Sequence, residues 1–352
     1  MLLQLLPTNT PESTPSIQRG SFHGAGGTLL GMQIVNVCLT IVTLGAYHFW
    51  AKAKIRRYLF SQTAFAGDRF AYHGTGKELY QGFLKAMVVF GIPYFSLGAA
   101  HSFLALPQSV DFLLQAMAAL VLFLYVPVAI VNARRYRCTR TSWRGIRFSF
   151  RGRTVDFLKL YFKGWLFTLL TLGTYYPYFQ TQRQAFLHSH TYFGNQRFRF
   201  TGHGSGLMVP FAVTLFTTYA VLCLCGLALA LQLTNAGLTL LLIPFVLGPV
   251  WVWLLGQKQK YYWDHTTFGE ARFSSSITWQ KLFGLYLGNL ALLLLTLGWA
   301  WPWVTVRNAR FFIGTLSLQG LTDLDRVLQD TTETSVTGEG LSNLLDTGFD
   351  MD

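Results

Sequence analysis

One short motif occurs four times in this chain, and each copy lies between long apolar segments. It opens on a threonine, turns at a Gly, Asn or Asp, and has arms in which aromatic residues alternate with small or basic ones. The four copies begin at Thr63, Thr141, Thr191 and Thr266. Alternation around such a centre is typical of a β-hairpin. The repetition predicts a chain built from copies of a single unit.

The apolar segments between these motifs have the length of membrane helices. The chain is 51% hydrophobic and only 12% charged, whereas soluble domains carry about 25% charged residues. A helix needs about 20 apolar residues to cross a bilayer. We therefore expect an all-α polytopic membrane protein with about seven membrane segments, short β-hairpins between the segments and an internal repeat. The seven segments cover residues 29–50, 82–106, 112–131, 160–179, 207–233, 237–255 and 282–303.

The first, fourth and seventh segments share one ending, in which Thr-Leu-Gly precedes aromatic and then basic residues. It stands at Thr43-Leu44-Gly45, Thr171-Leu172-Gly173 and Thr296-Leu297-Gly298. The glycine can end one helix and allow an interfacial helix to begin. If these segments cross the membrane, successive copies are inverted, as in many secondary transporters. If they are re-entrant instead, every hairpin lies on one side and could join one sheet.

The motifs also divide the chain into regions. The predicted regions are a disordered N-terminal tail (1–21), membrane repeat 1 (22–147), membrane repeat 2 (148–272), a truncated membrane repeat 3 (273–316) and an acidic C-terminal tail (317–352).

Basic residues lie directly beside the apolar segments, which predicts contact with anionic lipid headgroups rather than with nucleic acid. More of them fall in residues 51–81 and 132–159 than in 180–206 and 257–281, so the first pair should be cytoplasmic. The acidic tail could dock onto these basic regions or onto a protein partner. The candidate lipid- or partner-binding residues are Lys52, Lys54, Arg56, Arg57, Arg69, Arg134, Arg135, Arg147, Arg197 and Arg272.

Three amides fall inside or beside apolar segments, namely Asn36, Asn132 and Asn289. Hydrogen bonds between helices are one explanation. A polar pathway through the membrane is the other, because polar groups in lipid are costly and are often functional.

No catalytic constellation is visible, and we expect neither an enzyme nor a cofactor. Paired carboxylates and a complete phosphate loop are missing from the sequence. The spacing of His188, His190, His203 and His265 is more typical of surface or interfacial histidines than of a metal site.

Several of these stretches resemble the YjgN family of bacterial inner-membrane proteins. The resemblance is carried by Thr43-Leu44-Gly45-x-Tyr47-x-Phe49-Trp50-Ala51-Lys52, by Tyr72-His73-Gly74-Thr75-Gly76-Lys77-Glu78-Leu79, and by Phe22-x-Gly24-x-Gly26 before them. It is close over residues 22–82 and looser to about residue 314. It implies a bacterial inner-membrane location and a multipass fold. The family has no known function, so it implies no site residues. The fourth segment departs from the pattern, with Gln180-Thr181-Gln182 in place of a basic pair.

Two functions remain open. A transporter- or channel-like protein predicts a polar cavity near the membrane midplane, lined by residues such as Asn36 and Asn132. A membrane scaffold, whose basic hairpins bind lipid headgroups or proteins, predicts a dry helical bundle with a large polar face.

Overall fold

A closed barrel of short strands stands at one end of the molecule. In this computed structural model, which describes residues 17–103 and 107–320, ten antiparallel strands pair with their sequence neighbours, and β1 pairs with β10 to close the barrel. The strands are β1 (Gln18–Phe22), β2 (Thr63–Phe65), β3 (Asp68–Tyr72), β4 (Thr141–Trp143), β5 (Ile146–Phe150), β6 (Thr191–Phe193), β7 (Gln196–Phe200), β8 (Thr266–Phe268), β9 (Ala271–Ser275) and β10 (Leu316–Gln319).

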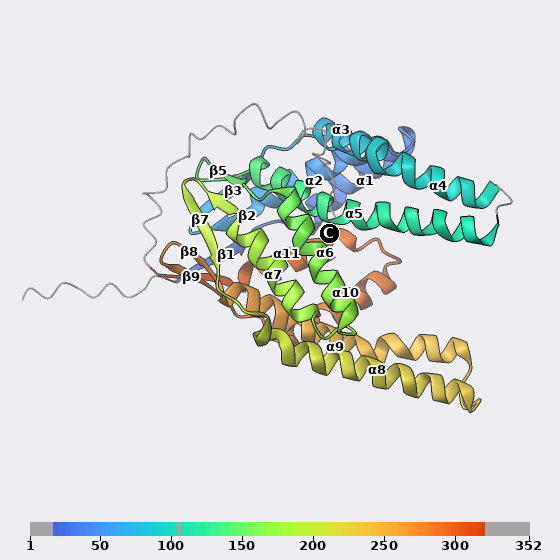
Figure 1. The fold of residues 1–352 in the computed structure, drawn as a ribbon. Helices are drawn as coiled ribbons and strands as arrows, with labels where there is room; N and C mark the ends of the chain where they lie inside the picture. The colour runs from blue at the N-terminus through green and yellow to red at the C-terminus, as the bar shows by residue number, and fades with distance from the viewer. Residues whose placement is uncertain (1–16, 104–106, 321–352) are drawn as a thin grey trace, which may run out of the picture.

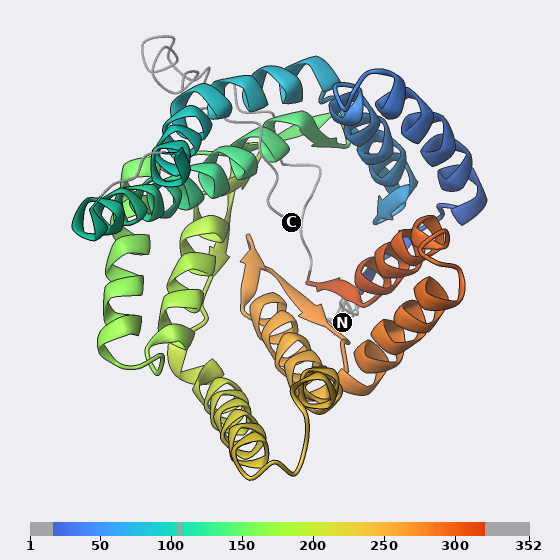
Figure 2. The ribbon, with the colours of Figure 1, turned by 90° about the vertical axis from the view of Figure 1, so that its right-hand side faces the viewer.

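The barrel is assembled from five repeated units, and each unit runs strand, outer helix, inner helix, strand. They cover residues 18–65, 68–143, 146–193, 196–268 and 271–319, and Figure 2 shows them arranged around a common axis. The helices are α1 (Gly26–Val42), α2 (His48–Gln62), α3 (Gly76–Ala86), a π-helical turn (Met87–Gly91), α4 (Ile92–Phe103), α5 (Gln108–Arg140), α6 (Thr154–Leu170), α7 (Tyr176–Ser189), a 3-10 turn (Gly204–Leu207), α8 (Met208–Ala230), α9 (Ala236–Asp264), α10 (Trp279–Leu295) and α11 (Trp301–Gly314).

The strand register makes the units equivalent. In each unit the last residue of the long strand faces the first residue of the short strand. Phe22 lies opposite Thr63, for example, and Tyr72 lies opposite Thr141. Tight turns then join one unit to the next, as Ala66 and Gly67 do with φ of 51° and 86°. The four predicted hairpins are therefore present, but they join adjacent units within one barrel.

The predicted fold class was wrong in two respects, because the molecule is not all-α and it does not have seven spans. Among the described residues, four helices are long and apolar enough to cross a membrane, at Gly76–Ala100, Gln108–Arg140, Gly204–Ala230 and Ala236–Asp264. They form the two long hairpins of units 2 and 4. The first, fourth and seventh predicted segments do not cross, because each breaks at its Thr-Leu-Gly and reverses direction as a short hairpin.

The Thr-Leu-Gly turn satisfies its own backbone. Leu44 and Gly45 have φ of 51° and 93°, and the Gly45 amide donates to the Thr40 carbonyl at 2.7 Å. The Thr43 hydroxyl donates to the Leu39 carbonyl at 2.7 Å and accepts from the Tyr47 amide at 3.0 Å, so it ends one helix and caps the next. Polar backbone groups without partners are excluded from lipid. This turn is therefore suited to a place without water.

The same turn forms the tip of each short hairpin, and each tip presents a leucine outward. Leu44, Leu172 and Leu297 are 97%, 82% and 91% exposed. The outer helix of unit 4 spans 27 residues with its 3-10 turn, against 17 in unit 1, a difference of about 15 Å at about 1.5 Å per residue. The hydrocarbon core is about 30 Å thick. The short hairpins are therefore shorter than the long ones by about half of that thickness, and the long hairpins project further from the barrel (Figure 1).

All five units point in the same direction, which excludes the inverted arrangement. Every strand belongs to the barrel, and the helical hairpins all extend from it to one side (Figure 1). The described far ends of the long hairpins, at 107–110 and 231–237, contain no Lys or Arg, whereas every long strand of the barrel carries an arginine. The positive-inside rule then predicts a cytoplasmic barrel.

Glycines let the units approach closely where a strand leads into an outer helix. A Cβ built on Gly76 would lie 2.6 Å from the Cα of Trp50 in the preceding unit, and one on Gly204 would lie 2.7 Å from the Cα of Tyr178. Neither contact leaves space for a side chain. The second glycine of the Gly-x-Gly elements is thus required for the ring to close.

The boundary between two neighbouring units is called a seam. An arginine at one repeated position, six residues before the short strand, donates a hydrogen bond across the seam, and we call these contacts the arginine clasps. Arg57 donates to the Gly74 carbonyl at 3.4 Å, Arg135 to Gly152 at 3.0 Å, and Arg310 to Gly24 at 3.3 Å, each reaching the following unit. Arg310 closes the ring from unit 5 back to unit 1.

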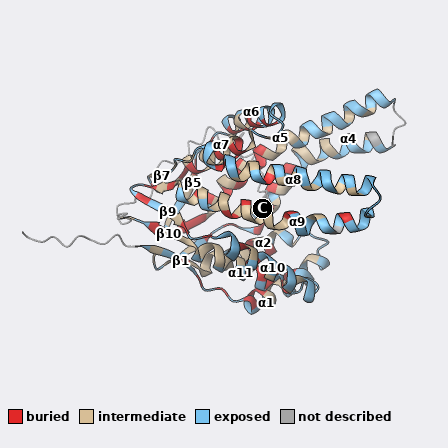
Figure 3. Ribbon diagram, turned by 90° about the horizontal axis from the view of Figure 1, so that it is seen from below, coloured by how far each residue is buried: buried red, intermediate tan, exposed pale blue. Residues whose placement is uncertain are grey.

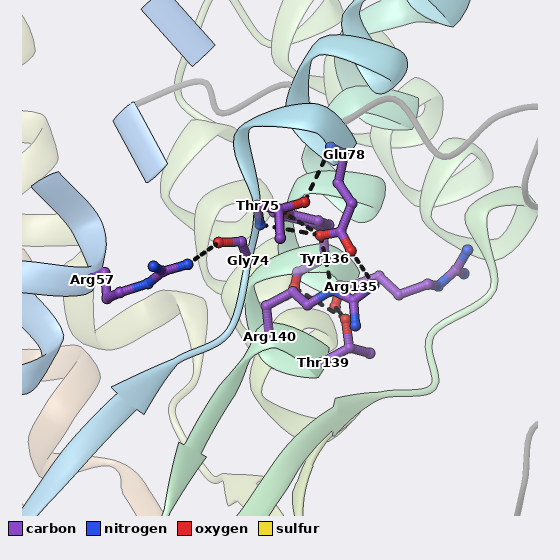
Figure 4. A network of polar contacts seen from close by, with 8 residues as sticks. All are labelled: Arg57, Gly74, Thr75, Glu78, Arg135, Tyr136, Thr139 and Arg140. Carbon is purple, nitrogen blue, oxygen red and sulfur yellow. Dashed lines mark hydrogen bonds and ion pairs between the residues drawn. The ribbon is translucent and has the colours of Figure 1, made fainter. Parts of the chain in front are cut away.

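At the seam of units 1 and 2 the clasp lies beside a carboxylate network (Figure 4). Glu78 forms a capping box with Thr75 and accepts from both Arg140 and the Tyr136 hydroxyl, with Arg140 to Oε1 at 2.8 Å. This network ties the two helices of unit 2 together, and the Arg57 clasp is the bond that joins it to unit 1.

Candidate functional site: the axial chamber

A chamber of about 570 Å³ lies on the axis inside the barrel, and every unit contributes to its wall. Its position follows from the fold, because the inward side chains of ten strands and the last turns of the inner helices meet there. Figure 3 shows buried residues concentrated at this end, while the hairpins are mostly exposed. The lining comprises Phe60, Phe65, Phe70, Arg134, Arg137, Cys138, Thr141, Trp143, Phe148, Gln184, His188, Thr191, Phe193, Phe198, Trp263, Thr266, Phe268, Phe273, Leu316 and Leu318.

Aromatic rings form the floor of the chamber, toward the hairpin turns. Trp143, Phe193 and Phe268 are 5%, 2% and 3% exposed, and Phe193 lies 5.4 Å from the Trp143 ring and 6.0 Å from the Phe268 ring. These three residues occupy equivalent places in β4, β6 and β8. We call them the aromatic floor. It lies at the end of the chamber where the hairpin turns are.

The upper wall differs from unit to unit at one equivalent position. Three residues before the short strand, unit 1 has Phe60, unit 2 has Cys138, unit 3 has His188 and unit 4 has Trp263, and all four line the chamber. A repeated scaffold thus presents a phenyl, a thiol, an imidazole and an indole around one level. The chamber has near-fivefold walls with an asymmetric set of chemical groups.

Positive charge enters the chamber from α5. Arg134 and Arg137 both line it, while no Asp or Glu is among the described lining residues. Arg134 donates from Nη2 to the Thr191 hydroxyl at 3.4 Å, and its buried Nε has no hydrogen-bond partner among the described residues. The described lining is therefore largely apolar, and its charged groups are the guanidinium groups of Arg134 and Arg137.

His188 faces the same space as a neutral imidazole. The Thr266 hydroxyl already donates to the Tyr262 carbonyl at 2.6 Å, so it accepts from His188 Nδ1 at 3.1 Å. The other ring nitrogen, Nε2, then accepts from the Gln184 amide. Burial, with the Arg134 charge as a lesser cause, lowers the pKa of His188 from 6.5 to about 3. The chamber charge at neutral pH therefore comes from the arginines.

The predicted basic residues lie in the chamber, at the seams between units, on α2 and on the outside of the barrel. Arg134 lies in the chamber, and Arg57 and Arg135 form arginine clasps. Lys52 and Arg56 are half-buried on α2, and Lys54 is exposed. The hairpin arginines are exposed on the outside of the barrel, and they are Arg69, Arg147, Arg197 and Arg272.

The three amides are buried within the helical layer, and none of them lines the chamber. Asn289 donates to the Asn308 side chain at 2.7 Å, which is the helix–helix bond expected of such a residue. Asn36 and Asn132 are 3% and 0% exposed. The acidic C-terminal tail, for which docking was predicted, lies outside the described residues from residue 321 onward, as does the N-terminal tail through residue 16.

Sequence reasoning missed most of the chamber. It interpreted His188 as surface or interfacial, and it assigned no site role to Cys138, Arg137 or Gln184. The missing signal was spacing. Each of these residues precedes a predicted strand by three, four or seven positions, so the hairpin register would have placed them on one side of the inner helices.

The fold and the chamber together define a multipass membrane protein, a ring of five helical hairpins mounted on a barrel that encloses an electropositive space. The chain belongs to the family described as bacterial protein of unknown function (DUF898), whose profile matches residues 17–344. It is an inner-membrane protein, because its relatives are named as inner membrane proteins and because it has four helices long and apolar enough to cross a membrane among the described residues.

Three curated relatives carry the name inner membrane protein YjgN. The protein of Escherichia coli O157:H7 is 35% identical over 130 residues, and that of Escherichia coli strain K12 is 32% identical over 130 residues. The protein of Salmonella typhimurium is 33% identical over 131 residues. Each alignment covers 37% of this chain and 30% of the relative, so the matched region is under a third of the relatives' length. No solved structure matches the chain.

Proposed function

We propose that the protein is a transporter-like membrane protein whose solute-binding site is the axial chamber. One observation carries the proposal, namely that all five units line a single chamber on the ring axis. Pockets of about 300–1,000 Å³ accept small organic molecules, and this one has about 570 Å³. The proposed role is binding and passage of a solute, without a catalytic step.

The chamber is electropositive, so the proposed solute is an anion. Arg134 and Arg137 supply the charge, and the described lining offers no carboxylate to oppose it. Passage toward the cytoplasm requires the aromatic floor to move, because Trp143, Phe193 and Phe268 close the axis below the chamber. Apolar constrictions of this kind gate other membrane pathways. The floor is the proposed gate.

Efflux of naphthalenesulfonate, a fluorescent organic anion, from proteoliposomes tests this function. We expect Phe193→Ala to open the floor and raise efflux severalfold over the wild-type protein, with the milder Phe268→Leu giving a smaller rise. Adding Arg137→Gln to Phe193→Ala should lower that efflux again. Efflux from the floor variants equal to that from protein-free vesicles would contradict the proposal. Monodisperse elution in detergent controls for folding.

A scaffold is a second candidate, and it is favoured by the outer surface of the barrel. Arg19 of β1 stands at the position equivalent to Arg69, Arg147, Arg197 and Arg272, so five exposed arginines encircle the barrel, one from each unit. We call them the arginine belt. Belts of this charge attract anionic lipid headgroups or acidic proteins. Replacing Arg69, Arg147 and Arg272 with Gln should reduce the anionic lipid that copurifies while leaving efflux unchanged.

A further inference from the structure

We infer that the chamber takes an amphipathic monoanion, a molecule with an apolar body and a single carboxylate or similar headgroup. The inference rests on the proposed solute-binding site and specifies its ligand. The apolar body would lie against the aromatic floor, and the headgroup would meet Arg134 and Arg137. Three independent features of the chamber support this arrangement.

The first feature is the separation of apolar and polar groups along the axis. Apart from the threonines that begin the short strands, the strands supply rings and aliphatic chains, including those of Phe70, Phe148, Phe198, Phe273 and Leu318 with the aromatic floor between them. The polar groups come from the inner helices above them or from the first residues of the short strands. A fully hydrophilic anion would leave the large apolar part of the chamber wet, whereas an apolar body fills it and releases that water.

The second feature is a set of donors without a matching acceptor. Arg134 Nε is buried and has no hydrogen-bond partner among the described residues. Its Nη2 reaches the Thr191 hydroxyl at a long 3.4 Å. His188 adds no charge of its own, because it is neutral, and both its ring nitrogens are already engaged. A guanidinium pairs best with a planar oxyanion, which it can meet through two parallel hydrogen bonds.

The third feature is the route into the chamber. The outer helices of units 1, 3 and 5 have 17 residues each, so the ring reaches its full height in units 2 and 4 only. Because the missing length is about half of a hydrocarbon core, we expect the ring axis to be approached through lipid from that side. The aromatic floor lies at the other end of the chamber. A molecule that dissolves partly in lipid can reach the arginines, whereas a small hydrophilic ion cannot.

Binding of radiolabelled decanoate tests the inference, with the full-length protein in nanodiscs of zwitterionic lipid and empty nanodiscs as background. We expect saturable binding that unlabelled decanoate and 2-naphthoate both displace. Decyltrimethylammonium, which has the same chain and the opposite charge, should not compete, and neither should acetate, which is the headgroup alone. A preference for decanoate would indicate a lipid-derived ligand, and a preference for 2-naphthoate a water-soluble aromatic acid, and either result supports the inference.

Variants assign the binding to the chamber. Arg134→Gln and Arg137→Gln should each weaken decanoate binding about tenfold or more, as loss of a charge-assisted hydrogen bond does. Arg134→Lys, which keeps the charge but loses the planar pair of donors, should bind decanoate more tightly than Arg134→Gln and more weakly than the wild-type protein, and monodisperse elution shows that each variant is folded. The matched control is Arg199→Gln, which removes the same charge from the exposed outer wall of β7.

Three results would overturn the inference. Equal competition by decyltrimethylammonium would show that only the apolar body is recognised, and equal competition by acetate would show that only the charge is. Failure of decanoate to bind would remove the ligand class altogether. These failures are separable from failure of the proposed function, because efflux of naphthalenesulfonate through the Phe193→Ala variant is measured without decanoate.

Discussion

The short and the long hairpins are built from the same unit, yet they reach different depths. Both leave the barrel through an outer helix and return through a basic inner helix, and both end on a strand of three or four residues. The long hairpins of units 2 and 4 cross the bilayer by length and composition. The short hairpins of units 1, 3 and 5 reverse at Thr-Leu-Gly. Depth is therefore set at the tip, and the barrel end stays constant.

The two kinds of tip solve the problem of exposed backbone in different surroundings. At the tip of unit 4, Asn235 caps α9 by accepting from the Leu238 amide at 2.7 Å. The described residues of this tip do not form the Leu-Gly turn with positive φ that the short hairpins share. At the tip of unit 3, Thr171 bonds both helices, and the neighbouring Leu172 is 82% exposed. The first tip resembles a helix cap in water. The second has the self-sufficient backbone that lipid requires.

Labelling with a membrane-impermeant maleimide should give the largest contrast between the two classes. In a chain whose native cysteines are replaced, Ser109→Cys at the start of α5 should react from outside the cell, and Leu172→Cys should react from neither side. The hairpin turns should react only from the cytoplasm, as tested with Asn195→Cys and Glu270→Cys. Labelling of Asn195→Cys from outside would restore the seven-span alternative.

The two kinds of tip should also differ in how far the free energy of unfolding falls when one capping hydrogen bond is removed. Thr171→Val leaves the Tyr175 amide without a partner in lipid, and we expect it to lower the free energy of unfolding by about 2–3 kcal/mol. Asn235→Ala removes one cap bond in water, which replaces it, and should cost about 1 kcal/mol. Reversible unfolding in mixed micelles measures both. Equal costs would mean that the short tips are in contact with water.

The arginine clasps should stabilise seams regardless of hairpin length. Arg135 joins a long unit to a short one, and Arg310 joins two short ones. Each Gln substitution should lower the free energy of unfolding by roughly 1.5 kcal/mol, because a charged donor to a partly buried carbonyl is lost. Arg199→Gln, outside the seams, provides the baseline. A large effect at Arg310 alone would indicate that closing the ring matters more than the other seams.

Local features of the fold could be predicted from the sequence, whereas closure of the ring could not. The hairpin signal at Thr63 and its three copies was strong because turn residues and alternation coincide over a few positions. Strand pairing between residues 18 and 318 depends on contacts across the whole chain, and no local pattern encodes it. The turn at Thr171 was visible, but hydropathy alone does not distinguish a helix that crosses from one that reverses.

The candidate site was predictable in chemistry but not in position. Arg134 was selected for its charge, and the structure places it in the chamber beside His188 and Gln184. Arg69 was selected on the same grounds and lies outside the barrel. The difference depends on which face of a strand or helix is turned inward, and this becomes known only when the barrel register is known. Residue charge was enough to select Arg134 and Arg69, whereas the barrel register decides that Arg134 faces the chamber and Arg69 faces outward.

A contrast in pH dependence is expected between the equivalent positions His188 in a short unit and Cys138 in a long one. Burial lowers the pKa of His188 to about 3 in the folded protein, whereas an unfolded histidine titrates near 6.5. Between these values the unfolded chain binds more protons, so stability rises with pH and is lost as the pH falls below about 6.5.

This contribution changes by at most about 1.4 kcal/mol per pH unit, and it should be fully present above pH about 6.5. His188→Gln should flatten the profile of unfolding free energy against pH between about 3 and 6.5, relative to the wild-type protein. Cys138→Ser, at the equivalent place in unit 2, should leave that slope unchanged. An identical slope in His188→Gln would mean that the imidazole accepts a proton inside the folded ring, and the neutral tautomer bonded to Thr266 would then be wrong.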